Sequence, residues 1–226
     1  MEPGARKRVA QVLKEEVRER ISGAALEVFA RKGYAPATMA EIAKAARVAT
    51  GNVYLYFPNK EELFHAVLPD TFVDTLSRLL RRRVEALSGI ADIGTLPDGA
   101  PYHAAAEELL RFCIDHRLRV VVLLSKAAGT KHASFAEETV ERLVKLAVAH
   151  ARSVGAAPVV TGTLRFALTR IYGSFVATMA AALAELADEA DVRAAVAHVT
   201  DYHLAGLKAL FEGARPSTRG RKETRS

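Results

Sequence analysis

Helix start and stop signals follow one another closely in the first quarter of the chain, and their spacing limits how it can fold. Thr38 and Glu41 form a capping box, in which each side chain can bond to the backbone amide of the other residue. Pro58 stops a second segment, because proline cannot continue a helix. Only short helices fit between these signals, so the sequence predicts one helix over about 39–46 and another over 50–57.

Longer helices are predicted on both sides of this pair. In the first, apolar residues recur at gaps of three and four: Val17, Ile21, Ala24, Ala25, Val28 and Phe29. Gly33 is placed to end that helix. Asn59 is placed to cap the next one, which is predicted to run to about Val84. This order of long and short helices predicts a helix-turn-helix, whose second short helix is narrow enough to enter the major groove of DNA.

The predicted second short helix divides into a core side and a polar side. Val53 and Phe57 face the core, whereas Tyr54 and Tyr56 point elsewhere and can donate hydrogen bonds to phosphate oxygens. The residues expected nearest to base edges are at the start of the helix: Thr50, Gly51 and Asn52.

The segment over residues 17–68 is very similar to the N-terminal domain of TetR-type bacterial transcriptional regulators. The motifs that carry the resemblance are FARKGY, TMAEIA, GNVYLYF and KEEL. The resemblance implies an all-α protein with an N-terminal three-helix DNA-binding domain that contains the helix-turn-helix. A larger helical ligand-binding and dimerisation domain is expected to follow. The resemblance also places Tyr54, Tyr56 and Lys60 beside DNA phosphates, and Thr38 is predicted to contact a phosphate as well.

The chain departs from the family pattern in the turn and in the second short helix. Arg47 and Ala49 stand where the family usually has a glycine and a capping serine. A left-handed Arg47 is expected to cost about 1 kcal/mol, and loss of the serine cap costs a similar amount unless Thr50 takes over the capping role. Thr50 and Leu55 replace a lysine and a tyrosine that are frequent in the family. No particular operator sequence can therefore be carried over from the family.

Three regions are predicted: a DNA-binding domain over 1–64, a regulatory and dimerisation domain over 65–213, and a disordered basic tail over 214–226. In the second region, helices are expected over about 102–116, 118–128, 133–154, 159–187 and 192–212.

The resemblance implies that the last two helices pair with their copies in a homodimer. One stripe of small residues fits close helix packing: Gly173, Ser174, Ala177, Ala181 and Ala182. A second stripe is larger: Val192, Val196, Val199, His203, Leu207 and Leu210. The alternative is that both stripes pack inside a single chain.

The effector is expected to be a small hydrophobic molecule held within about 102–175. The candidate pocket residues are polar or aromatic and lie on apolar helices: Phe112, His116, Phe135, Phe166 and Arg170. Arg170 is the most specific of them, because an arginine on so apolar a helix needs an anion or water as a partner. Glu137, Glu138 or Glu141 could be that partner within the chain. If none of them is, the anion is expected to come from the effector, which would then be a lipophilic carboxylate.

The net charge of +6 is concentrated at the two ends of the chain, which suits contact with a polyanion. The one cysteine excludes an internal disulfide and indicates a reducing compartment. No uncharged apolar stretch reaches about 18 residues and no signal peptide is evident, so a cytoplasmic protein with no membrane contact is expected.

No enzyme, cofactor or metal site is expected. Cys113 and His116 share a helix face, but a lone cysteine on such a helix is far more often part of the core. The group His198, Asp201 and His203 also fails as a metal site, since histidines five apart lie on different faces. The interpretation is a sequence-specific transcriptional regulator, a repressor that a small molecule releases from a palindromic operator. The alternative is a helical interaction or ligand-binding bundle with a degenerate helix-turn-helix.

Overall fold

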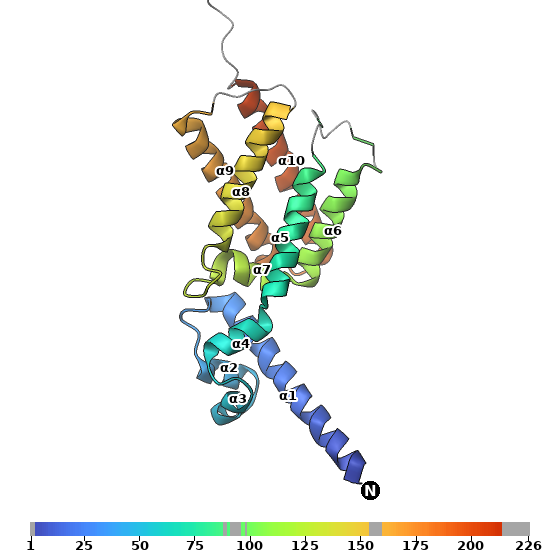
Figure 1. Ribbon diagram of the computed structural model, residues 1–226, viewed down its shortest axis with the longest axis vertical. Helices are drawn as coiled ribbons and strands as arrows, with labels where there is room; N and C mark the ends of the chain where they lie inside the picture. Colours follow the sequence, from blue (N-terminus) through green and yellow to red (C-terminus); the bar gives the residue numbers. More distant parts are fainter. Residues whose placement is uncertain (1–2, 88–89, 91–95, 98, 154–159, 214–226) are drawn as a thin grey trace, which may run out of the picture. The chain divides into compact units, whose positions relative to one another are not determined.

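The computed structural model of the chain describes residues 3–87, 90, 96–97, 99–153 and 160–213 (Figure 1). Every regular element within these ranges is helical, which confirms the predicted all-α class. The elements are α1 (Pro3–Lys32), α2 (Met39–Ala45), α3 (Thr50–Tyr56), α4 (Lys60–Val67), α5 (Asp70–Glu85), α6 (Pro101–Asp115), α7 (Arg117–Val121), the π-helical segment η2 (Val122–Lys126), α8 (Phe135–Ser153), α9 (Gly162–Glu185) and α10 (Glu189–Gly213).

The chain divides into two compact units. Unit 1 comprises Met1–Arg78, Phe112–Ala136 and Leu183–Glu185, and unit 2 comprises Leu79–Arg111, Glu137–Ala182 and Leu186–Ser226. The predicted boundary at residues 64 and 65 stays a prediction, and the predicted tail over 214–226 lies outside the described residues.

The core of unit 1 is built around α1, which packs against α2, α4, α7 and η2. Ile21, Phe29 and Ile42 are fully buried there. Phe29 and Phe64 meet edge to face with ring centroids 5.6 Å apart, and Tyr34 lies 4.9 Å from Phe64 by the same measure. Edge-to-face aromatic pairs of this kind add stability beyond the area that they bury, so they fix α4 against the end of α1.

One expected helix is broken in two. The predicted long helix after Asn59 ends at Val67, and α5 starts afresh at Asp70. Pro69 explains the break, because it has no N–H to donate and disfavours helical backbone at the residue before it. The backbone of Leu68 is accordingly non-helical, with φ −134° and ψ 72°.

Unit 2 buries part of the larger stripe expected to form a dimer interface. Val192, His203 and Leu207 are each at least nine-tenths buried within the single chain. Intrachain packing therefore covers these three residues of α10, whereas the other three are half-buried: Val196, Val199 and Leu210. In the small-residue stripe, by contrast, Ser174 and Ala177 are exposed.

Candidate nucleic-acid interface

The turn between α2 and α3 has the geometry of a helix-turn-helix. The capping box is present: the Thr38 hydroxyl accepts from the Glu41 amide at 3.2 Å, and the Glu41 carboxylate accepts from the Thr38 amide at 2.9 Å. Arg47 adopts a left-handed conformation with φ 54° at the turn. Ala49 then precedes α3 without any side-chain cap, so Thr50 does not take over that role.

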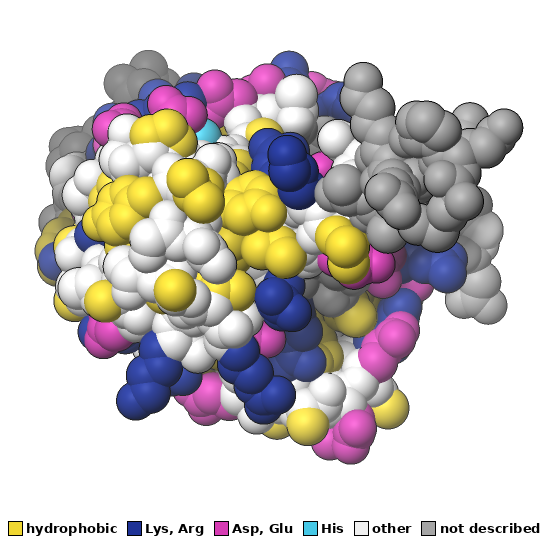
Figure 2. All heavy atoms as spheres, turned by 90° about the horizontal axis from the view of Figure 1, so that it is seen from below, with side chains coloured by type: hydrophobic (Ala, Val, Ile, Leu, Met, Phe, Trp, Pro, Cys, Tyr) yellow, Lys and Arg dark blue, Asp and Glu magenta, His cyan; other side chains and the backbone are white. Residues whose placement is uncertain are grey.

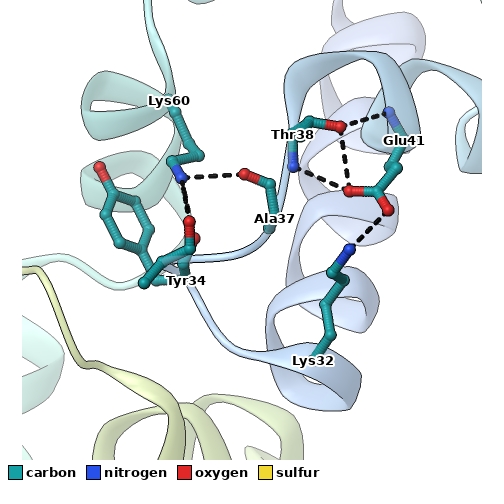
Figure 3. Close-up of polar contacts among 7 residues, drawn as sticks. Lys32, Tyr34, Ala37, Thr38, Glu41 and Lys60 are labelled. Carbon is teal, nitrogen blue, oxygen red and sulfur yellow. Dashed lines mark hydrogen bonds and ion pairs between the residues drawn. The ribbon is translucent and has the colours of Figure 1, made fainter.

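Glu41 links the capping box to α1. Its carboxylate also accepts from the Lys32 ammonium, in the ion pair drawn in Figure 3. The Lys32 ammonium and the Thr38 hydroxyl and amide together lower the pKa of Glu41 to about 2. The carboxylate is therefore ionised throughout the physiological range, and the start of α2 stays tied to the end of α1.

Lys60 holds the loop between α1 and α2. Its ammonium donates to the carbonyl oxygens of Tyr34 at 2.9 Å, Ala35 at 3.1 Å and Ala37 at 2.9 Å (Figure 3). It also lies 4.3 Å from the centre of the Tyr34 ring. Burial lowers the pKa of the Lys60 amine. An ammonium has three donors, so a contact between Lys60 and a DNA phosphate would have to share or replace these bonds.

The sides of α3 are arranged as the sequence suggests. Val53 is fully buried, whereas Thr50, Gly51 and Asn52 are exposed. Tyr54 is 49% exposed, Thr38 is exposed, and Tyr56 and Lys60 are half-buried. Figure 2, which views the molecule from the side of α2 and α3, shows hydrophobic side chains beside Lys and Arg side chains. All seven residues predicted to contact DNA are thus at least partly accessible, and their contacts with DNA stay predictions.

Sequence reasoning treated Leu55 only as a departure from the family. The structure leaves it 81% exposed on α3, the second most exposed of the large hydrophobic side chains among the described residues. Its spacing of four from Gly51 was a signal that both share the outward face of the helix.

The candidate pocket residues are divided between the two units. Phe112 and His116 are half-buried in unit 1 and pack against Phe72, with ring centroids 5.2 Å and 5.6 Å away. Phe135 is buried in the same unit.

Phe166 and Arg170 belong to unit 2 and lie at its surface. Phe166 is 64% exposed, and the guanidinium of Arg170 lies 5.5 Å from the centre of its ring. Arg170 is exposed in unit 2, so its charge does not require an anionic partner there, and a contact with a ligand carboxylate stays a prediction.

No group of three or more metal-ligating side chains occurs among the described residues. Of the three residues considered for a metal, His203 is buried, whereas His198 and Asp201 are exposed. Cys113 is half-buried on α6.

Residues 21–67 match the family described as "Bacterial regulatory proteins, tetR family". This match covers the helix-turn-helix, so the N-terminal part of the chain is similar to TetR-type regulators. Among curated members, the transcriptional regulator HbdR of Aromatoleum sp. (strain CIB) is 36% identical over 76 residues, 34% of this chain and 33% of HbdR. The regulator SrpR of Pseudomonas putida is 48% identical over 64 residues, 28% of this chain and 29% of SrpR. The chain thus spans about a third of the length of these curated relatives.

Solved structures of TetR-like regulators also resemble the chain. One from Rhodococcus sp. RHA1 is 23% identical and aligns over 86% of this chain and 93% of its own, with a TM-score of 0.40. The family match itself lies within residues 21–67, which contain the helix-turn-helix.

Proposed function

We propose that the chain is a transcriptional regulator of the cytoplasm that binds a palindromic DNA operator as a homodimer. The observation that carries the proposal is the outward face of α3. Val53 anchors the helix in the core, while Thr50, Gly51 and Asn52 are exposed at its start. Recognition helices present their N-terminal residues to base edges in the major groove in this way.

The apolar surface of unit 2 supports the homodimer. Tyr202 on α10 is 83% exposed and Phe166 on α9 is 64% exposed. Only 28% of the most apolar 18-residue window of α9 is buried. By length and composition α9 could cross a membrane, but core helices of soluble proteins pass the same test. If α9 and α10 of a second copy pack on these helices, the apolar surface is removed from water without a membrane.

A dimer of helix-turn-helix units reads two half-sites, and a ligand can change the separation of its two reading helices. We propose that the regulator is a repressor released by a small hydrophobic effector. The half-exposed aromatic pair Phe112 and His116 supports a binding site of that chemistry. An effector that binds the DNA-incompetent arrangement about 100-fold better shifts the equilibrium by about 2.7 kcal/mol, enough to release an operator.

The test is binding to fluorescent duplexes selected from random DNA, followed by anisotropy over a range of salt concentrations. We expect tight binding to a palindrome and weak, strongly salt-dependent binding to unrelated duplexes. Asn52→Ala should cost about 1–3 kcal/mol and relax the preference at one base position. Equal affinity for all duplexes would contradict the proposal.

A further inference from the structure

Gly51 lies in a helix that does not need a glycine. It belongs to α3, its backbone does not have a positive φ, and a Cβ atom built on it meets no other atom within 4 Å. On propensity scales, a glycine inside a helix destabilises the helix by up to about 1 kcal/mol relative to alanine. Neither the turn nor the packing of unit 1 therefore accounts for a glycine at this position.

Leu55 is equally unexplained by the fold. Its side chain is 81% exposed, although burial of a leucine normally favours folding. A single exposed leucine is ordinary on a protein surface. Its position is what makes it informative: it follows Gly51 by four residues, so both lie on one face of α3, about 6 Å apart along the helix axis. Val53, which is buried, lies on the opposite face.

A glycine and a projecting leucine in this order suit one kind of partner. The glycine lets a backbone approach another surface closely. The leucine then presents methyl groups one turn further along. In the major groove, the apolar group on a base edge is the C5-methyl of thymine, and apolar side chains recognise it by contact.

We propose that Leu55 reads the C5-methyl group of a thymine in each half-site, and that Gly51 permits the close approach of α3 that this contact needs. The inference rests on the proposed binding of DNA in the major groove and names a base that the site prefers. Asn52, three residues before Leu55, is its neighbour on the helix surface. The thymine is therefore expected next to the base pair that Asn52 contacts.

The experiment uses the full chain and its preferred palindrome from in vitro selection. Each thymine of the half-site is replaced in turn by uracil, which removes the methyl group and leaves the hydrogen-bonding pattern unchanged. At one thymine we expect wild type to bind about three- to fivefold more weakly to the uracil duplex, as loss of one buried methyl group predicts.

The Leu55→Ala variant should bind the thymine and uracil duplexes equally. Leu13→Ala is the matched control, since Leu13 on α1 is also exposed, at 55%, and lies outside α3. The Leu13→Ala variant should keep the wild-type ratio of affinities for the thymine and uracil duplexes at that position. Both side chains are mainly in solvent, so neither change threatens folding.

Gly51→Ala separates folding from binding. The variant should melt about 2–4 °C higher than wild type, yet bind the palindrome at least about fivefold more weakly, because the added methyl group blocks the close approach. Gly23→Ala is its control: Gly23 is an exposed helical glycine of α1 whose Cβ would also meet nothing within 4 Å. That variant should gain stability and keep its affinity.

The outcomes are distinguishable. If wild type selects no DNA sequence, the proposed function fails and this inference fails with it. If wild type selects a palindrome but the uracil effect is absent or survives Leu55→Ala, the thymine contact is overturned and the proposed function stands. If Gly51→Ala binds as tightly as wild type, the close approach of α3 is overturned.

Discussion

Arg47 holds the turn of the helix-turn-helix in a conformation that a side chain disfavours. Its φ of 54° is the only positive value among the described residues other than glycine. We expect Arg47→Gly to raise the free energy of unfolding by about 0.5–1 kcal/mol, because glycine adopts this conformation without steric conflict. Urea unfolding measures the change. Arg20→Gly, at an exposed helical position of α1, should instead lower the same quantity by about 1 kcal/mol.

Ala49 leaves the first amides of α3 without a side-chain cap. We expect Ala49→Ser to stabilise the protein by about 1 kcal/mol, because a serine hydroxyl accepts from an otherwise unpaired amide at the helix start. Thermal unfolding of the variant checks this. The same substitution at the exposed Ala40 inside α2 should be neutral or slightly destabilising, and equal effects at both positions would contradict a capping role.

His203 is a buried imidazole in unit 2. Its ring lies 4.3 Å from that of Phe175 and 4.7 Å from that of Tyr172, and its Nε2 has no hydrogen-bond partner among the described residues. Burial, with a smaller contribution from the charge of Arg83, lowers the pKa of His203 from 6.5 to about 4. The unfolded chain thus takes up a proton at a higher pH than the folded one does.

The stability that the neutral His203 contributes is therefore complete above pH 6.5 and is lost as the pH falls towards 4. We expect this residue to add about 1.4 kcal/mol per pH unit to the slope of stability against pH in that window. His203→Phe should reduce the slope measured by urea unfolding between pH 6.5 and 4. His198→Phe, at an exposed position of α10, is the control. An unchanged slope in the His203 variant would show that another group causes it.

At the scale of elements, one side chain of α4 holds the loop between α1 and α2 by hydrogen bonds. Lys60 donates to three carbonyl oxygens of that loop. We expect Lys60→Met to lower the free energy of unfolding by about 2 kcal/mol, because hydrogen bonds from a charged donor are lost. The Tyr34 carbonyl keeps one partner, the Ala37 amide at 3.2 Å. Lys44→Met, at an exposed position of α2, should change it little.

The same variant tests whether Lys60 also contacts DNA. A phosphate contact adds about one to the slope of log affinity against log salt concentration. If the slope falls by about one in Lys60→Met, the ammonium turns to a phosphate in the complex. If affinity falls with an unchanged slope, Lys60 acts by holding the loop.

The helix-turn-helix could be predicted from sequence because its signals are local. The capping box at Thr38 and Glu41 and the stop at Pro58 each act within one turn of the chain. The break at Pro69 could have been predicted from the same rules, yet the periodicity on both sides of it favoured one helix. The stripe on α10 could not be assigned, because periodicity shows that Leu207 is apolar but does not show which surface covers it. The exposure of Phe166 and Arg170 depends on tertiary packing for the same reason.

At the scale of the whole molecule, the exposed apolar side chains of α9 and α10 define the candidate dimer interface. We expect Tyr202→Glu and Phe166→Glu to yield monomers, because a dimer would then bury unpaired carboxylates. Light scattering measures the mass. Tyr54→Glu on α3 is the control that should stay dimeric while it loses affinity for DNA by charge repulsion. Dimers that persist in both interface variants would place the contact elsewhere.

The buried and exposed faces of α3 differ in how freely their residues can change during evolution. Val53 is committed to the core, so most replacements of it destabilise the domain and are removed by selection. Gly51 and Leu55 are not needed for folding, so substitutions at these two positions can change operator preference while the fold is kept. A gene duplicate of this regulator can therefore acquire a new set of target promoters through single codon changes, without first gaining stability elsewhere.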